Sequence, residues 1–455
     1  MGRLMLLLLA NGCFLLSERD LQDRLAPAGD SGQPDSGNPD DSTDSESTDS
    51  ADDTGGPDSG DTGGPRLFYE DLDGDQSGNP DISTEAKIAP LGFVDNRWDC
   101  DDNDDSEPVW VAGDAGSLGD GSFDQPLTTI SAGALKSVKC VRVRPGTYEE
   151  NVRLGGHNLD IEGVEGATNT TIKANVRGST IEIAGGEHAR LSGLTITGGT
   201  GSTTGSFPYG GGIYLINPAE LVAENLVISG NSATNGGGIY SSSPNLKLTD
   251  IQITENDAYA GGAFLQEGGW TEGLRVTISE NTGTYAAAGY QSNGVTTLTN
   301  SIVDANRGSD GMDGIYVISG SLALINCTLF DHDTAVSADG RDGNQSDIWI
   351  QNTIVGGGEF GLVGYEENEF DVRYSWFFDH FTANWYPPES DPTGTAGNVA
   401  GNPGLEDATD DGDAANDDLH LSAGSPAIDA GDPSILDADN STSDVGAYGG
   451  PDAEP

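Results

Sequence analysis

The central part of the chain alternates apolar and polar residues at every second position, in a series of short runs. Six of these runs are LSGLTITGG from Leu191, then NLVISGNSA, DIQITENDA, RVTISENTG, NSIVDANRG and NCTLFDHDT. Gly, Asn and Asp, which favour turns, bound each run, so each run predicts a short β-strand with one buried face. No helical periodicity interrupts the runs, and the pattern therefore indicates an all-β fold.

The runs recur at a nearly fixed distance along the chain. One column advances by a constant step and consists of Asn231, Asn256, Asn281 and Asn306, with Asp331 on the next step. A second column has a step that is one position longer and consists of Asn300, Asn326 and Asn352. A period in the twenties predicts a solenoid, in which each coil buries its apolar face against the next and bonds to it through the backbone. The length divided by this period predicts about a dozen coils.

Glycines follow the same period, as in NGGGIYSS from Asn235. A phosphate-binding loop would carry its glycines once and would usually continue with Gly-Lys-Ser/Thr, so these glycines are interpreted as structural. The column that begins at Asn231 is interpreted in the same way, as an amide ladder in which each side chain bonds to the next.

An aromatic column accompanies the glycines at nearly the same step and is formed by Tyr214, Tyr240, Phe264, Tyr290 and Tyr316. If Ile213 and Leu215 point into the core, alternation directs these rings outward, about 5 Å apart. The rings then either stack on one another or form a stripe on which sugars lie. Self-stacking is the simpler interpretation, and the second one makes the five rings candidate glycan-binding residues.

Charged residues gather on the coils between residues 304 and 342. The catalytic candidates among them are Arg307, Asp331, His332 and Asp333, and the step of the asparagine column places His332 over Arg307. The other members of this patch are Asp304, Asp310, Asp313, Asp339, Arg341 and Asp342. A base beside clustered carboxylates is what a polysaccharide lyase or hydrolase requires, although charged turns are also ordinary on a solenoid surface.

The overall charge restricts the partners. The chain has 75 acidic and 19 basic residues and a formal net charge of −56. This charge repels phosphate backbones and anionic lipids, so we do not expect a nucleic-acid partner. It attracts divalent cations and keeps the chain soluble.

The N-terminal part consists of two segments. Residues 1–13, MGRLMLLLLANGC, have a basic start and an apolar stretch that is too short to span a membrane. They resemble a bacterial lipoprotein signal, which implies a lipid on Cys13 as the membrane contact and an exported protein, either a cell-surface lipoprotein or secreted. Residues 14–65 are acidic and, from Pro27 onward, contain no aromatic residue and no aliphatic one larger than alanine. They predict a disordered tether.

Residues 66–107 form a separate acidic module, with carboxylates at alternate positions of two turns, DLDGD from Asp71 and DCDDND from Asp99. Oxygen ligands with this spacing suit Ca²⁺. Together with Tyr69 and APLGFV from Ala89, the turns resemble a metal-binding motif of bacterial surface proteins that is related to thrombospondin type 3 calcium repeats. The resemblance implies Ca²⁺ as a cofactor, with the candidate ligands Asp71, Asp73, Asp75, Asp99, Asp101, Asn103 and Asp104.

The remaining domain, residues 108–450, begins with GDGSFDQPLTTI, VRVRPGTYEENV and LDIEGVEGATNTTI and ends with NPGLEDATDDGDAANDDLHLSAGSPAIDAG and the residues that follow. These segments and the repeated runs resemble right-handed, single-stranded parallel β-helix proteins of the pectate-lyase-like class. The resemblance implies that fold and is much less specific for activity. The acidic segment from Asp407 to Asp418 is interpreted as a spacer before the closing motif.

The favoured function is a calcium-stabilised, monomeric surface module that binds or adheres to polysaccharides or other surface ligands. The alternative is a carbohydrate-active enzyme, a polysaccharide lyase or hydrolase. If Cys13 carries lipid, an odd number of cysteines remains, which does not indicate a disulfide framework. Buried thiols are the default for Cys140 and Cys327, and a bridge between Cys100 and Cys140 is the alternative.

Overall fold

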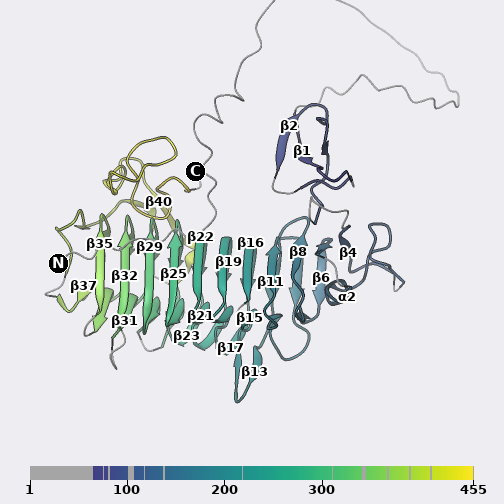
Figure 1. The fold of residues 1–455 in the computed structure, drawn as a ribbon. Helices are drawn as coiled ribbons and strands as arrows, with labels where there is room; N and C mark the ends of the chain where they lie inside the picture. Colours follow the sequence, from purple (N-terminus) through teal and green to yellow (C-terminus); the bar gives the residue numbers. More distant parts are fainter. Residues whose placement is uncertain are drawn as a thin grey trace, which may run out of the picture. The chain divides into compact units, whose positions relative to one another are not determined.

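The computed structural model describes residues 65–453, apart from residues 75, 80–81, 101–106, 117, 137–138, 218, 310, 341–344, 366–367, 389–390 and 410–411. The lipidation prediction for Cys13 and the tether prediction fall outside the described residues. The described part is the predicted all-β solenoid of parallel strands (Figure 1). None of its helices is both long enough and apolar enough to cross a membrane.

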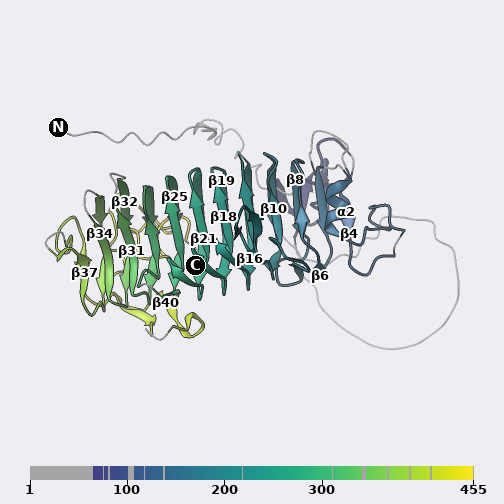
Figure 2. The same ribbon diagram turned by 90° about the horizontal axis from the view of Figure 1, so that it is seen from below.

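Two sheets form the walls of the β-helix. The first has ten strands, from successive coils: β7 (Val152–Arg153), β10 (Ile181–Ile183), β15 (Ile213–Ile216), β18 (Ile239–Ser242), β21 (Phe264–Glu267), β24 (Gly289–Ser292), β28 (Ile315–Val317), β31 (Thr334–Asp339), β34 (Phe360–Tyr365) and β37 (Ala383–Tyr386). Figure 2 shows members of this sheet side by side.

The second sheet has 19 strands: β4 (Val109–Val111), β5 (Cys140–Val143), β6 (Gly146–Glu149), β8 (Leu159–Gly163), β9 (Thr170–Lys173), β11 (His188–Ser192), β12 (Thr195–Thr197), β16 (Glu220–Ser229), β19 (Asn245–Thr254), β22 (Trp270–Ser279), β25 (Gly294–Thr299), β26 (Ile302–Asp304), β29 (Gly320–Ile325), β30 (Thr328–Phe330), β32 (Ser346–Gln351), β33 (Ile354–Gly356), β35 (Glu369–Arg373), β36 (Trp376–Phe378) and β38 (Val399–Ala400).

Smaller elements complete the described structure. Six strands form an outer layer: β13 (Ser202–Thr204), β14 (Phe207–Tyr209), β17 (Ser232–Asn235), β20 (Asp257–Ala260), β23 (Thr282–Tyr285) and β27 (Arg307–Gly308). An antiparallel sheet of β1 (Arg66–Glu70), β2 (Ser83–Ala86) and β3 (Phe93–Val94) precedes the β-helix. The remaining elements are the helix α2 (Ile130–Leu135), the 3₁₀ turn η3 (Ala414–Asn416) and the hairpin of β39 (Leu405–Asp407) and β40 (Asp418–Leu421).

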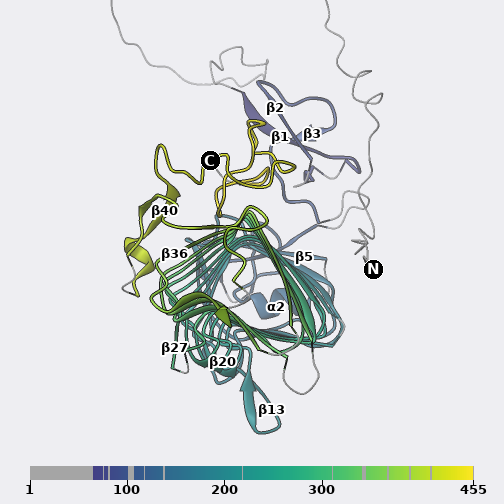
Figure 3. The same ribbon diagram turned by 90° about the vertical axis from the view of Figure 1, so that its left-hand side faces the viewer.

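The core lies inside the coils, which Figure 3 shows end on. Inward side chains stack from coil to coil, for example Ile228, Ile253 and Ile278, which are in register on successive strands. At one end, α2 adds Ile130 and Ala134 to the same core. Alternation along each strand buries one face, as the sequence pattern predicted.

The second sheet turns a corner at one residue per coil, and this residue has a positive φ. The corner residues, with φ between 49° and 57°, are Asn225, Asp250, Arg275, Asn300, Asn326 and Asn352. Asn and Asp adopt this left-handed conformation more readily than other non-glycine residues, which explains the predicted column of Asn300, Asn326 and Asn352.

The ten strands of the first sheet indicate about ten coils in the described part, slightly fewer than the dozen expected from the length. The closing segment, residues 401–450, adds no coil. It folds back over the outer face of the second sheet, where Leu419, Ala427 and Val445 pack on Phe330 and other outward apolar side chains. In Figure 1 this segment is the yellow part that carries β40.

Candidate functional site

The predicted asparagine ladder is confirmed. The side-chain amide of Asn231 donates to Oδ1 of Asn256 at 3.0 Å, Asn256 donates to Asn281 at 3.0 Å, and Asn281 donates to Asn306 at 2.9 Å. Each asparagine is buried and also donates to a backbone carbonyl of the preceding coil. The ladder therefore satisfies polar groups inside a turn and presents no surface to a ligand.

The tyrosine column points outward as predicted, but other side chains cover it. Tyr214, Tyr240 and Tyr316 expose only 4, 6 and 6% of their surface. They do not belong to the main core, and Tyr214 and Tyr240 pack with Tyr209 and Tyr285 of the outer layer. These rings offer little area for stacking on a sugar.

Phe264 does not belong to the tyrosine column. Leu265 is the residue in register with both Tyr240 and Tyr290, whereas Phe264 is in register with Ile239 and packs on the main core. The step from Tyr240 to Phe264 is one position shorter than the local coil, and a one-residue slip turns a side chain to the other face of its strand. The prediction that Phe264 shares the stripe is wrong.

Two of the tyrosine hydroxyls donate to carboxylates one coil away. Tyr240 donates to Oε2 of Glu267 at 2.7 Å, and Tyr316 donates to Oδ2 of Asp339 at 2.5 Å. Burial, followed by the hydrogen bond to Glu267, raises the pKa of Tyr240 well above its ordinary value. Both hydrogen bonds connect adjacent coils.

The four catalytic candidates do not converge on one open site. Arg307 bonds to Oδ1 of Asp331 at 2.5 Å and to the backbone oxygen of Asp331 at 2.6 Å. His332 is 1% exposed, and burial lowers its pKa to about 3. Asp333 is exposed, and its backbone N–H donates to Asp313 at 3.1 Å.

The step of the asparagine column predicted that His332 stacks on Arg307, and this prediction is wrong. Its Nε2 lies 3.2 Å from Nδ2 of Asn306, so the ring occupies the next position of the asparagine ladder. The coil that ends at His332 is one residue longer than those before it, and this places His332 where the sequence count placed Asp331. Asp310, Arg341 and Asp342 lie outside the described residues.

Asp417 lies near this patch, although the sequence pattern predicted that it belongs to a spacer. Asp304, Asp331 and Asp417 lie close enough that the charges of Asp417 and Asp331 act on Asp304. Burial and these two charges raise the pKa of Asp304 to about 8. The sequence does carry a signal for a segment that covers this face. Outward positions that are mostly polar in earlier coils are occupied by Ile302, Phe330 and Ile354 in later ones.

Three of the predicted calcium ligands are described. Oδ1 of Asp71 accepts a hydrogen bond from the backbone of Gly74 at 2.8 Å, and Gly74 has a φ of +83°, as a tight turn requires. Asp73 is exposed and Asp99 is buried. Asp75, Asp101, Asn103 and Asp104 lie outside the described residues. Within the described part, no three acidic, His or Cys side chains are grouped to hold a metal ion.

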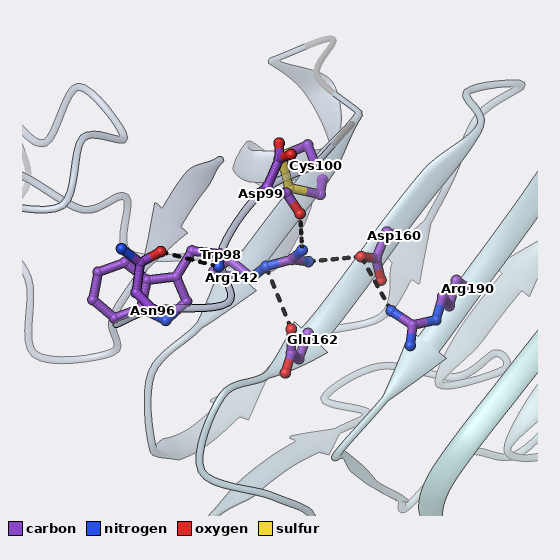
Figure 4. The surroundings of a disulfide bond; sticks show 9 residues. Asn96, Trp98, Asp99, Cys100, Arg142, Asp160, Glu162 and Arg190 are labelled. Atoms are coloured by element: carbon purple, nitrogen blue, oxygen red, sulfur yellow. Dashed lines mark hydrogen bonds and ion pairs between the residues drawn. A yellow bond between two sulfur atoms is a disulfide. The ribbon is translucent and has the colours of Figure 1, made fainter. Parts of the chain in front are cut away.

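A disulfide between Cys100 and Cys140 joins the acidic module to the β-helix (Figure 4). Beside it, Arg142 is fully buried and bonds to Oδ2 of Asp160 at 2.7 Å and to the backbone oxygen of Asp99 at 3.0 Å. Of the two alternatives for Cys140, the bridge is therefore the one in the structure. Cys327 is a free buried thiol, and burial raises its pKa to about 12.

The described residues also form a groove of about 700 Å³ along the second sheet. Its floor includes a row of outward side chains on consecutive coils, in register one above another: Val227, Gln252, Thr277 and Ile302. Adjacent coils are about 4.8 Å apart, so this row repeats at that spacing, with Gln252 and Thr277 as its polar members and Val227 and Ile302 as its apolar ones.

Ion pairs between coils line one side of the groove. Arg190 bonds to Glu224 at 2.6 Å, and Arg275 bonds to both oxygens of Asp250 at 2.5 and 2.9 Å. Arg97 pairs with Glu162 toward the first coils, and Ala447 and Tyr448 of the closing segment form the opposite end. No single residue in the sequence marks this groove, because it arises from the stacking of several coils.

Neither protein-family models nor curated proteins match this chain. Among solved structures, the chain is similar to the pectate lyase Pel9A, with 13% identity, a TM-score of 0.42, and 75% of this chain and 97% of that chain covered. It is also similar to a pectin methylesterase from Aspergillus niger (13%, 0.35, 67% and 91%) and to the GH136 lacto-N-biosidase from Eubacterium ramulus (10%, 0.36, 64% and 67%).

Proposed function

We propose that the chain is a binding module that holds an extended glycan in the groove along its second sheet. The observation that carries the proposal is the repeated floor, Val227 to Ile302, which offers one polar or apolar side chain per coil beside arginine–carboxylate pairs. Hydroxyl, amide, guanidinium and carboxylate groups of this kind can accept and donate hydrogen bonds to neighbouring sugar hydroxyls.

The charge of the groove favours a neutral glycan. Arg190 and Arg275 each bond to a carboxylate, so the groove wall carries no excess positive charge for a uronate. The net charge of −56 on the whole chain adds repulsion against any polyanion.

We propose binding rather than catalysis, since the groove and the charged patch are separate. Asp331 and His332 are buried, and His332 serves the asparagine ladder. If the chain is instead a lyase or hydrolase, as the alternative holds, incubation with a polysaccharide would release new reducing or unsaturated ends.

We extend this proposal to the N-terminal part of the chain, as a calcium-binding module, a tether and a lipid anchor. The carboxylates of Asp71 and Asp73 are hard oxygen donors of the kind that Ca²⁺ takes, and the disulfide at Cys100 would transmit the stiffening of this module to the first coils. A tethered surface lipoprotein would then present the groove to glycans outside the cell.

The test is calorimetric titration of the full chain with a panel of neutral and acidic polysaccharides. A neutral member should bind, and Arg190→Ala should weaken it about tenfold by removing one wall pair. Arg373→Ala is the matched control, because Arg373 forms a comparable pair with Asp371, at 2.7 Å, away from the groove residues. Equal affinity in wild type and Arg190→Ala, or no binding to any member, would contradict the proposal.

A further inference from the structure

The accessible floor of the groove stops abruptly at one coil. Gln252 is exposed, and Thr277 and Ile302, its successors in register, are half-buried. The next two residues of the same row are Thr328 and Ile354, which expose only 0 and 1% of their surface. The row of outward side chains therefore continues, but it is open only as far as Ile302.

The backbone of the closing segment, in yellow in Figure 1, lies directly on the covered part of this row. The backbone N–H of Ala447 donates to Oγ1 of Thr328 at 3.0 Å. A methyl group on Gly446 would meet Cδ1 of Ile354 at 2.8 Å, whereas carbon atoms in contact lie about 3.5–4.0 Å apart. A sugar ring therefore cannot pass between Gly446 and the row.

Side chains of the coils hold this segment at the end of the groove. The side-chain amide of Asn300, which lines the groove, donates to the backbone oxygens of Ala447 and Gly449 at 2.9 and 2.5 Å. Nη1 of Arg275 donates to the backbone oxygen of Asp452 at 3.2 Å. Ala447 and Tyr448 thus form a wall across the end of the floor.

The row stays accessible in the other direction, toward the first coils. Val227 is in register with Thr195, Thr195 with Thr171, and Thr171 with Thr147. Thr195 and Thr171 are half-buried, and Thr147 is exposed. A chain that lies on the floor can therefore continue along this row.

The ion pair near the first coils belongs to the side of the groove. Glu162, the partner of Arg97, is in register with Ser192, and Ser192 is in register with Glu224. These residues form a neighbouring row, three positions before the floor row on each strand. The pair thus borders the row and does not end it.

We propose that the groove is blind at the closing segment and open toward the first coils, so that it binds a neutral glycan by one chain end. The terminal sugar lies on Ile302 against Ala447 and Tyr448, and the rest of the chain leaves toward Thr195 and Thr171. This inference rests on the function proposed above. It specifies the part of the glycan that is recognised, which is a chain end and not the interior of a polymer.

The length of the row sets how affinity depends on glycan length. At about 4.8 Å per coil, the floor from Ile302 to Val227 is about 14 Å long, and the row as far as Thr147 is about 29 Å long. Each added sugar gains contacts until the chain leaves this row, and further sugars gain none. A linear polymer has one end of each kind, so it holds one protein however long it is.

Isothermal titration calorimetry of the full chain tests this proposal with linear β-glucan, xylan, mannan and galactan. Each is used as length-fractionated polymer and as its own oligosaccharides. For a member that binds, the stoichiometry should be one protein per glycan molecule at every length. The affinity per molecule should rise about tenfold from the shortest oligosaccharide to those that fill the row, and should change less than about twofold beyond them.

A variant at the wall provides a second test. Asn300→Asp retains a residue that tolerates the corner φ of 49°, but its carboxylate repels the oxygens of Ala447 and Gly449. The loosened wall should let a polymer pass, so that a long polymer holds more than one protein. Asn225→Asp makes the same change at an exposed corner with a φ of 52°, in an earlier coil, and should keep one protein per polymer.

Amide hydrogen exchange at Ala447 reports whether the wall has loosened in Asn300→Asp. Faster exchange there with one protein still bound per polymer would overturn the role of the wall. If this variant does not fold, the stoichiometry of wild type decides alone. Several wild-type proteins per polymer, in proportion to its length, would overturn end recognition and leave the proposed function standing, whereas no binding at any length would contradict the proposed function itself.

Discussion

Nδ2 of Asn306 lies 3.2 Å from Nε2 of His332, so a histidine continues the asparagine ladder at the point where a catalytic base was a candidate. The ring is buried in the turn and occupies the position that an asparagine side chain occupies in earlier coils. His332 therefore continues the ladder beside Asn306, whose Nδ2 also donates to the backbone oxygens of Ile278 and Asp304.

Replacement of His332 should affect stability according to this role. His332→Asn can continue the ladder, and its free energy of unfolding should stay within about 1 kcal/mol of wild type. His332→Ala removes the contact with Asn306 and leaves a cavity, so its free energy of unfolding should fall by about 2–4 kcal/mol. Chemical denaturation measures both. Equal losses for the two variants would show that the amide contact does not matter.

The same residue should make stability depend on pH in a defined direction. The pKa of His332 is lowered to about 3 in the folded chain, so its contribution is present above its ordinary pKa of 6.5 and is lost as pH falls toward 3. In His332→Asn, the denaturation midpoint should change less between pH 6.5 and 4 than it does in wild type. Parallel curves for the two proteins would contradict a buried neutral imidazole.

The disulfide between Cys100 and Cys140 should contribute measurably to stability. It closes a loop with a sequence separation of 40, for which chain entropy predicts about 4 kcal/mol. Cys140→Ser should therefore unfold at lower denaturant concentration, and reductant should shift wild type in the same direction. Cys327 should react with a thiol reagent only after unfolding, because it is fully buried.

Calcium should order the acidic module. Trp98 stacks on Phe123 at 5.5 Å and contacts Trp110 at 5.0 Å, so its fluorescence reports on the junction of module and coils. We expect chelation to change this fluorescence and Ca²⁺ to restore it, with Asp73→Asn requiring more Ca²⁺ and the exposed Asp114→Asn unchanged. A signal indifferent to Ca²⁺ would argue against the cofactor.

The repeat made much of the fold predictable. Strand alternation and the constant step between coils were sufficient for the solenoid and for the ladder from Asn231 to Asn306, since each coil contacts only its neighbours. Phe264 and His332 were misplaced because single-residue changes in coil length alter which face a side chain occupies.

Contacts between distant parts of the chain were not predictable in this way. The hydrogen bond from Asn300 to Ala447 spans 147 residues, and the effect of the Asp417 charge on Asp304 depends on how the closing segment folds back. Neither the segment nor the groove that it ends follows from local periodicity.

A bulky side chain in the groove tests most directly whether a glycan binds there. Thr277 lies on its floor, and Thr277→Trp should occupy the track, while Val295→Trp places the same ring on an exposed site that does not line it. Calorimetry with the neutral polysaccharide panel should show binding to wild type and Val295→Trp and at least a tenfold loss for Thr277→Trp. Undiminished binding by Thr277→Trp would show that the glycan binds elsewhere and would contradict binding in the groove.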